Sequence, residues 1–244
     1  MPRFFTTKEQ ISDTEIIISG GDAFHIARSL RMAVGEEITV SDGEGAVYAC
    51  RLTDIKDDRC VAEILECTDA KSESPVRISL YMGYPKGDKL ETVVQKAVEL
   101  GACEIIPFES SRCIKRPKAD RIEKQLGRLN KIAEEAAKQC GRAILPTVKP
   151  TLSYPEMLKE AKKADLSLFC YEAEDRKSLK EALEGADRPS SISIVVGSEG
   201  GFSPEEARAA AEAGLTSVTL GPRILRCETA PDYALAAISY RFEL

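Results

Sequence analysis

The sequence is poor in the residues on which many catalytic and metal sites depend. His25 is the single histidine among 244 residues, which excludes histidine-rich metal sites and leaves a serine or cysteine nucleophile only one distant imidazole. None of the eight cysteines stands in a Cys-x-x-Cys pair, so zinc and redox motifs find no support. We interpret the cysteines as small, mostly buried side chains of a protein in a reducing compartment.

Several motifs are missing as well. The sequence lacks the motif G-x-G-x-x-G, which disfavours a Rossmann-type enzyme. It also lacks the motif G-x-x-x-x-G-K-[ST], with which a P-loop cradles phosphates. No apolar run approaches the roughly 20 residues of a membrane span, and the opening MPRFFTTKEQ lacks the apolar segment of a signal peptide. With 43% hydrophobic and 30% charged residues, the composition is that of a soluble globular protein. We expect it to be cytoplasmic.

Charge is present but unevenly distributed. The net charge of −6 argues against indiscriminate nucleic-acid binding. From residue 112 to residue 149, however, four acidic residues face eleven basic ones: Arg112, Lys115, Arg116, Lys118, Arg121, Lys124, Arg128, Lys131, Lys138, Arg142 and Lys149. An acidic protein with one basic stretch is a reasonable specific binder of a polyanion.

The N-terminal part of the sequence predicts a small β-barrel or sandwich with a short helix over 22–30. The turns DGEG and KDDR favour hairpins, and the strand-like segments are 14–19, 37–42, 46–55 and 60–67. The polar segment DAKSESPV contains proline and has no periodicity, so we place the domain boundary there. The predicted domains are 1–70 and 77–244, with 71–76 as a linker.

From residue 77 onward strands and helices alternate, which predicts an α/β domain with a mostly parallel sheet and helices on both faces. The expected strands are 77–84, 103–108, 165–171, 191–196 and 215–220. The longest helix, over 120–139, carries an apolar row at steps of three and four: Ile122, Leu126, Leu129, Ile132, Ala136 and Cys140. Its other face carries Lys124, Arg128, Lys131 and Lys138, which fit either a solvated surface or a nucleic-acid contact.

Two loops of this domain are candidates for a ligand site. VGSEGGFSPEE at 196–206 contains glycines that allow positive φ and close approach of a ligand. LGPRILRCETA at 220–230 joins a strand to the last helix. Because the carboxyl ends of parallel strands share one edge, the two loops are predicted to converge on one pocket. A tight structural turn, a surface charge at Arg223 and an ion pair between Arg226 and Glu228 are the alternatives.

Six stretches together resemble the bacterial 16S ribosomal RNA uridine-N3 methyltransferases called RsmE, of the SPOUT class. They are HIARSLRMAVGEEI, QKAVELGACEIIPF, SSRCIK, EEAAKQCGR, VGSEGGFSPEE and LGPRILRCETA, and they extend over essentially the whole chain. Two positions depart from the family's pattern. Ser198 stands where GPEGG has proline, and Cys227 stands where RTETA has threonine.

The resemblance implies S-adenosylmethionine-dependent methylation of N3 of a specific uridine in 16S ribosomal RNA of the small ribosomal subunit, without a metal. It also implies a PUA-like or OB-like RNA-binding domain, a C-terminal domain with a deep trefoil knot, and a homodimer packed through the knotted domains. Two alternatives keep this fold: a methyltransferase for another RNA uridine, and a catalytically silent RNA-binding factor of ribosome assembly.

Under this resemblance Arg226 stabilises the negative charge that develops on the uracil ring, and Glu228 either orients Arg226 or accepts the N3 proton. The target base must be unpaired to expose N3. Ile224 and Leu225 are expected to pack on the adenine and Glu199 to bind the ribose hydroxyls. The expected cofactor residues are Tyr171, Glu172, Gly197, Glu199, Gly200, Gly201, Leu220, Gly221, Ile224 and Leu225.

RNA contacts are expected from basic and polar side chains of both domains. They are Arg3, His25, Arg28 and Arg31 in the first domain, and Arg112, Lys115, Arg116, Gln139 and Arg142 in the second. Such contacts to the phosphate backbone hold the register of the RNA without reading its sequence.

Overall fold

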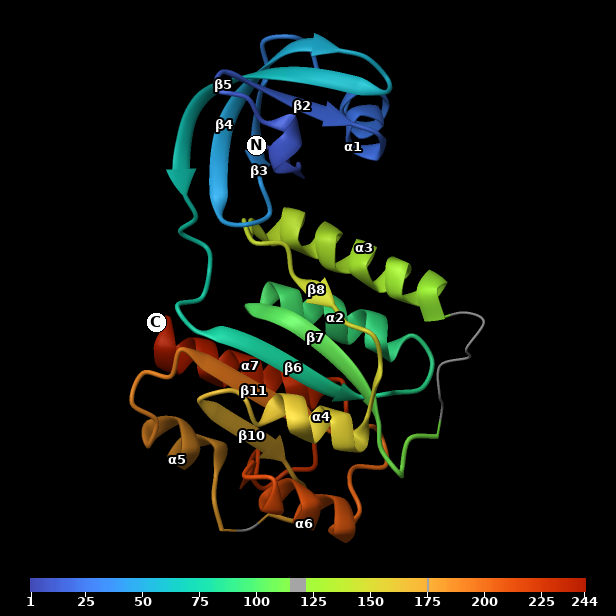
Figure 1. Cartoon of the computed structure of the whole chain (residues 1–244), viewed down its shortest axis with the longest axis vertical. Helices are drawn as coiled ribbons and strands as arrows, with labels where there is room; N and C mark the ends of the chain where they lie inside the picture. The colour runs from blue at the N-terminus through green and yellow to red at the C-terminus, as the bar shows by residue number, and fades with distance from the viewer. Residues whose placement is uncertain (115–121, 175) are drawn as a thin grey trace. The chain divides into compact units, whose positions relative to one another are not determined.

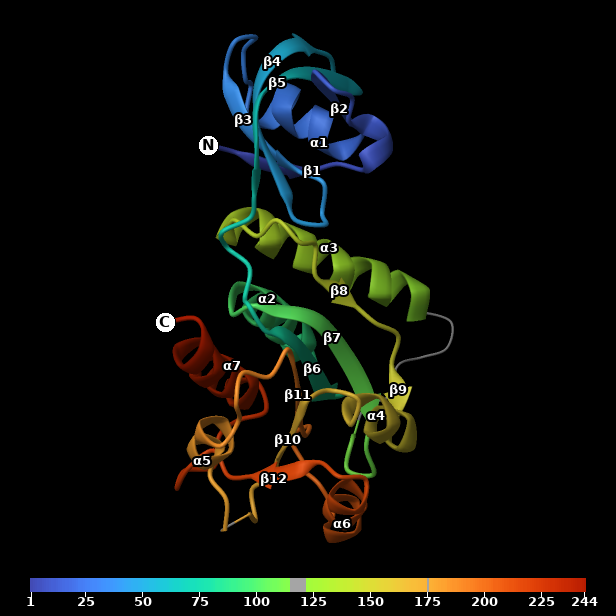
Figure 2. The same cartoon turned by 60° about the vertical axis from the view of Figure 1, so that its left-hand side comes forward.

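The computed structural model describes residues 1–114, 122–174 and 176–244, and Figures 1 and 2 show the course of the chain. The chain forms two compact units. One comprises Met1–Glu73 and Ala137–Leu145, and the other comprises Ser74–Ala136 and Pro146–Leu244. The first division falls inside the expected linker. The return of residues 137–145 to the first unit differs from the sequence-based boundaries.

The first unit is built on a curled sheet of strand order β1-β3-β4-β5-β2 (Figure 1). Strand β1 pairs in parallel with β3, and the other pairs are antiparallel. Burial alternates along strands such as β2 and β3, because successive side chains of a strand point to opposite faces of the sheet. The elements are β1 (Arg3–Phe5), η1 (Lys8–Gln10), β2 (Glu15–Ser19), α1 (Gly21–Phe24), η2 (His25–Ser29), β3 (Glu37–Ser41), β4 (Ala46–Ile55) and β5 (Arg59–Asp69).

The core of this unit gathers Phe4, Ile16, Ile38, Leu52 and Cys60 with their neighbours. The helix expected over 22–30 is an α-helical turn, α1, continued by the π-helical turn η2. Strand β1 was not expected from the sequence, because three residues carry too little periodicity to be recognised.

The second unit contains a parallel sheet of order β12-β10-β11-β6-β7-β8, with β9 beside β7. Every described pair in it is parallel, which confirms the predicted α/β architecture. Its elements are β6 (Arg77–Gly83), α2 (Lys89–Glu99), β7 (Ala102–Glu109), α3 (Ile122–Cys140, whose last residues belong to the first unit), β8 (Thr147–Val148), β9 (Leu152–Ser153), α4 (Tyr154–Ala161), β10 (Leu166–Cys170), α5 (Leu179–Glu184), β11 (Ser191–Val196), α6 (Pro204–Glu212), β12 (Thr216–Val218) and α7 (Thr229–Phe242).

Helices cover both faces of this sheet. Helices α2 and α7 lie against each other on one face, and α4 lies on the opposite face (Figures 1 and 2). On the α4 side, Tyr81, Phe169 and Val195 of the strands pack with Met157 of α4 and Ala210 of α6. The segment β8–β9–α4 was missed from the sequence, because its strands have two residues each.

Helix α3 differs in detail from its predicted amphipathic pattern. Leu129 and Ala136 are buried as expected, but the buried row also contains Ala133 and Ala137, whereas Ile122 at the start is exposed. Small alanines therefore form much of the contact surface. The basic face is partly neutralised, since Arg128 pairs with Glu91 at 2.8 Å, Lys138 with Asp22 at 2.8 Å and Lys131 with Glu135 at 4.0 Å.

Candidate active site

A cavity of about 500 Å³ opens at the carboxyl edge of the second unit's sheet. Loops that follow β10, β11 and β12 form its walls, together with the start of α2 beyond β6. Because these four strands are neighbours in the sheet, their carboxyl ends bring distant parts of the sequence together. The prediction that loops 196–206 and 220–230 converge on one pocket is confirmed.

All ten residues expected to bind the cofactor line this cavity, and Arg226 lines it too. Glu228 does not line the cavity. Its Oε2 lies 3.2 Å from Nζ of Lys89, and Lys89 does line the cavity. The remaining lining residues were not expected at the site from the sequence: Lys89, Cys170, Val196, Ser198, Thr219, Arg223, Cys227 and Ala230. Lys89 lies in PKGDK, shortly after the carboxyl end of a parallel strand, and that position was the available signal.

The glycine-rich loop is shaped by close contacts with two side chains. Gly201 has φ +60°, and a Cβ there would lie 2.3 Å from Oε1 of Glu172. A Cβ on Gly200 would lie 2.9 Å from Cβ of Arg112, whose Nη1 donates to the Gly200 carbonyl at 3.1 Å. Glycine is therefore favoured at Gly201 by its positive φ and at Gly200 by close packing against Arg112. Arg112 supports the loop, and because its side chain is exposed the expected contact with RNA stays a prediction.

A buried carboxylate connects the same loop to the segment after β7. Oε2 of Glu206 accepts the N–H of Ser203 at 2.9 Å, which completes the capping box of α6. Its Oε1 accepts the N–H of Ser111 at 2.7 Å. Glu206 thus satisfies backbone donors from two segments and fixes how the loop enters α6.

Three charged groups meet beside the cavity. Nζ of Lys89 lies 3.2 Å from Oε1 of Glu199 and 3.2 Å from Oε2 of Glu228. Burial pushes the pKa of Glu199 upward, but backbone N–H groups, including that of Lys86, and the Lys89 ammonium outweigh it, so the pKa is lowered. The pKa of Glu228 is also lowered, chiefly by the thiol of Cys227, whose Sγ donates to Oε2 at 3.1 Å. Both carboxylates are therefore ionised at neutral pH.

Arg226 differs from these groups because its side chain is exposed and makes no ion pair with any described residue. Its backbone carbonyl accepts the N–H groups of Thr229 and Ala230, each at 2.9 Å, at the start of α7. The alternative of an ion pair between Arg226 and Glu228 is wrong, since Glu228 pairs with Lys89 instead. The guanidinium of Arg226 keeps its donors for a ligand.

Comparison with known proteins identifies the family of this chain. The model of the RNA methyltransferase domain matches residues 72–239, and that of the RNA methyltransferase PUA domain matches residues 18–65. The ribosomal RNA small subunit methyltransferase E of Bacillus subtilis is 35% identical over 251 residues, covering 100% of this chain and 98% of that protein. The chain belongs to the ribosomal RNA small subunit methyltransferase E family.

Solved structures of similar proteins extend over both units. The ribosomal RNA small subunit methyltransferase E of Neisseria gonorrhoeae, bound to S-adenosyl methionine, is 36% identical with a TM-score of 0.87, covering 98% of this chain and 97% of that chain. A methyltransferase of Legionella pneumophila in complex with its cofactor SAM is 28% identical, also with a TM-score of 0.87, covering 98% and 96%. The fold of this family is therefore shared along the whole chain.

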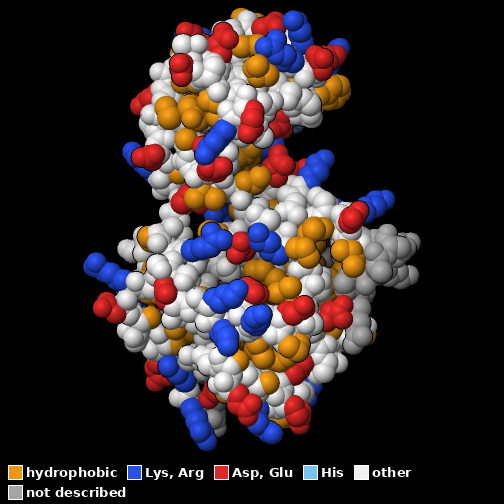
Figure 3. Space-filling model, viewed as in Figure 1, with side chains coloured by type: hydrophobic (Ala, Val, Ile, Leu, Met, Phe, Trp, Pro, Cys, Tyr) orange, Lys and Arg blue, Asp and Glu red, His pale blue; other side chains and the backbone are white. Residues whose placement is uncertain are grey.

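The RNA-contact residues predicted for this family member are placed unequally in the first unit. His25, Arg28, Arg31 and Gln139 are exposed, but Nε of Arg28 is bound to Oδ1 of Asp57 at 2.9 Å. Arg3 donates from Nη1 to the Arg142 carbonyl at 3.2 Å. Acidic side chains are interspersed among the basic ones on the face shown in Figure 3. Lys115 and Arg116 lie outside the described residues.

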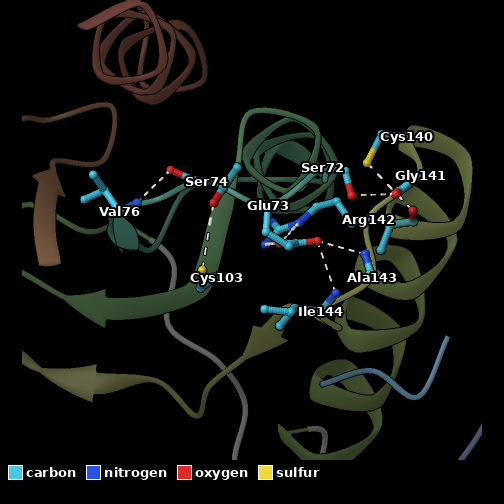
Figure 4. Close-up of polar contacts among 12 residues, drawn as sticks. Ser72, Glu73, Ser74, Val76, Cys103, Cys140, Gly141, Arg142, Ala143 and Ile144 are labelled. Atoms are coloured by element: carbon cyan, nitrogen blue, oxygen red, sulfur yellow. Dashed lines mark hydrogen bonds and ion pairs between the residues drawn. The ribbon is translucent and has the colours of Figure 1, made fainter. Parts of the chain in front are cut away.

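The burial of Arg142 contradicts the prediction that this residue contacts RNA. The residue is 3% exposed, and its Nη2 lies 2.8 Å from Oε2 of Glu73 (Figure 4). Oε1 of Glu73 accepts the N–H groups of Ala143 and Ile144 at 2.8 and 3.1 Å. The charge of Arg142 is thus neutralised inside the first unit by a carboxylate from the expected linker. The Glu73 carboxylate thus joins residues 142–144 to the segment at residue 73.

Within residues 1–114, 122–174 and 176–244, no helix has the length and apolar character needed to cross a bilayer. No group of three or more histidine, cysteine, aspartate or glutamate side chains in that part is arranged to hold a metal ion.

Proposed function

We propose that the protein transfers the methyl group of S-adenosylmethionine to N3 of a specific uridine in 16S ribosomal RNA of the small ribosomal subunit, in the cytoplasm. The observation that carries the proposal is that the ten expected cofactor residues and Arg226 line one cavity. The Neisseria gonorrhoeae relative, which was solved bound to S-adenosyl methionine, supports the choice of cofactor.

The residues of the cavity fit this cofactor. Its volume of about 500 Å³ lies within the range of roughly 300–1,000 Å³ that is typical of small-molecule sites. Leu220, Ile224 and Leu225 offer apolar surface for an adenine ring, and the carboxylates of Glu172 and Glu199 complement positive charge. When bound, S-adenosylmethionine supplies an electrophilic methyl group on sulfur and leaves as S-adenosylhomocysteine.

The protein's own residues hold the target base and its charge. Loss of the N3 proton leaves a lone pair that forms the new N–C bond, and the negative charge spreads onto O2 and O4 of the uracil. The unpaired guanidinium of Arg226 is suited to stabilise that charge. Glu228 is ionised and held by Lys89 and Cys227, and it is assigned either to orient Arg226 or to accept the proton.

Partners follow from the same proposal. His25 and Arg31 of the first unit are exposed and suited to contact phosphate groups, with Arg28 joining them if it exchanges Asp57 for RNA. A homodimer formed through the second unit and a trefoil knot in its last segments remain predictions from the family resemblance. No metal takes part in the proposed reaction.

The test is transfer of labelled methyl groups to undermodified small ribosomal subunits and, in parallel, to naked 16S RNA, with the product nucleoside identified by mass spectrometry. We expect 3-methyluridine on the subunit and little on naked RNA, since RNA is recognised largely by shape. A methylated uridine at another site would support the alternative substrate. Cofactor binding without transfer to either substrate would support the ribosome-assembly factor.

A further inference from the structure

Neither the sequence motifs nor the proposed reaction gives Lys89 a role of its own in methyl transfer. It is the first residue of α2, and its ammonium reaches two carboxylates from different loops. Glu199 belongs to the loop between β11 and α6, and Glu228 directly precedes α7. One cation on a third element therefore connects the two loops that form most of the cavity wall.

The short distance between the two carboxylates makes the positive charge of Lys89 important for both of them. Both carboxylate oxygens lie 3.2 Å from the same nitrogen, so they are separated by no more than twice that distance. The side chains are only partly exposed, at 36% for Lys89 and 25% for each glutamate. Two like charges this close and partly shielded from water repel each other strongly unless a cation lies between them.

The other donors to the two carboxylates are uncharged groups. Glu199 accepts the backbone N–H of Lys86 at 3.1 Å, and Glu228 accepts the thiol of Cys227 at 3.1 Å. The same thiol lies 3.8 Å from Nζ of Lys89. Neither the amide nor the thiol carries a positive charge. Lys89 is thus the cation that both carboxylates share among the described residues.

We propose that Lys89 is a positioning residue for methyl transfer: its ammonium keeps Glu199 and Glu228 ionised and holds their two loops together around the cavity. The proposal rests on the proposed function, because it concerns the same site. Without Lys89, the two carboxylates lose the cation that they share, and their repulsion is relieved when one of them takes up a proton, which raises its pKa. The loops that carry Glu199 and Glu228 then lose the contact that joins them.

The experiment compares Lys89→Met, Lys89→Arg and the wild-type chain. Lys96→Met serves as the matched control, since Lys96 lies on the same helix and pairs with Glu99 at 3.1 Å, away from the cavity lining. Single-turnover transfer to small ribosomal subunits is measured as a function of pH, and S-adenosylhomocysteine binding is measured by calorimetry. Each variant is first checked for cooperative unfolding.

We expect Lys89→Met to slow transfer at least tenfold and to move the acid limb of the pH–rate profile to higher pH. The sign follows because removing a neighbouring cation raises the pKa of a carboxyl group, so the active ionised form is lost at a higher pH. Lys89→Arg keeps the acid limb in place, and Lys96→Met behaves as the wild type. A Lys89→Met profile with an unmoved acid limb overturns the proposal, whether or not the rate falls.

A second measurement separates this inference from the proposed function. Carbon-13 NMR of labelled glutamate carboxyl groups, assigned with Glu199→Gln and Glu228→Gln, reports both titrations without any substrate. We expect both to shift to higher pH in Lys89→Met, and unchanged titrations overturn the role of Lys89. Failure of the wild type to transfer methyl groups overturns the proposed function alone, because the NMR result then still decides the role of Lys89.

Discussion

The two units each contain a cluster of opposite charges, and the clusters differ in how completely they are enclosed. In the first unit Arg142 and Glu73 are 3% and 13% exposed, and both Glu73 oxygens are occupied by the guanidinium and two backbone N–H groups. In the second unit Lys89, Glu199 and Glu228 are 25% to 36% exposed beside a cavity. The two clusters thus differ in the solvent exposure of their side chains and not in the kind of charges that they contain.

The difference has a physical basis. A buried ion pair keeps its partners because separating them leaves an uncompensated charge away from water, so the Arg142–Glu73 pair is suited to hold segments together. The partly exposed cluster is held less tightly and lies where a ligand can alter its environment. We therefore expect changes in the first cluster to affect mainly stability and changes near the second to affect mainly transfer.

The largest expected effect is on the stability of the first unit. Arg142→Met leaves the Glu73 carboxylate buried without its cation, which costs about 3–5 kcal/mol of the free energy of unfolding. Denaturant titration of the full chain measures this. Arg28→Met is the matched control, because its pair with Asp57 is 62% and 52% exposed, and such exposed pairs contribute little to stability. Equal losses in the two variants would contradict the comparison.

The second effect concerns Arg226 and lies mainly in the rate. Arg226→Gln removes an exposed guanidinium that pairs with no carboxylate in the described part of the chain, so we expect single-turnover transfer to fall about 10²–10³-fold, as for other groups that stabilise developing negative charge. Cofactor binding and the midpoint of unfolding should change little in comparison. Arg226→Lys tests whether charge without the planar fork is sufficient. An unchanged transfer rate in Arg226→Lys would remove the assigned role.

The cavity was largely predictable from the sequence because its position follows from topology. Strand–helix alternation implies a parallel sheet, and a parallel sheet places the loops after β10, β11 and β12 at one edge. Glycines and charged residues in those loops then identify the lining. Lys89 was missed because one lysine near a strand end carries no motif, and its two partners lie more than a hundred residues away in the sequence.

The RNA-contact residues were less predictable, since a basic side chain in the sequence does not reveal its partner. Arg142 stands in a basic stretch, yet Glu73 neutralises it in the fold. The helical periodicity of α3 likewise gave no sign that residues 137–145 belong to the first unit. Both cases concern contacts between segments that lie from 69 to 139 residues apart, which local patterns do not encode.

The third prediction is an acid dependence of stability. Burial alone would raise the pKa of Glu73, but Arg142 and the N–H groups of Ala143 and Ile144 lower it below its ordinary value of 4.5. The contribution of Glu73 to stability is therefore full above pH 4.5 and is lost as the pH falls through the lower folded-state pKa. Unfolding free energies measured between pH 6 and pH 3 should fall more steeply in the wild type than in Glu73→Gln. Parallel slopes would contradict the assignment.

The smallest effect concerns Cys227, which stands where the family pattern has threonine. Burial raises the pKa of its thiol to about 12, so the thiol stays protonated and donates to Glu228 across the neutral range. Cys227→Ala loses this hydrogen bond and should cost about 1 kcal/mol more than Cys170→Ala, because Cys170 is a buried thiol with no such donation in the described part of the chain. Cys227→Thr retains a donor and should recover most of the difference. If the threonine and alanine variants are equally stable, the thiol acts through its volume alone, and the second cluster is held only by Lys89 and the backbone of Lys86.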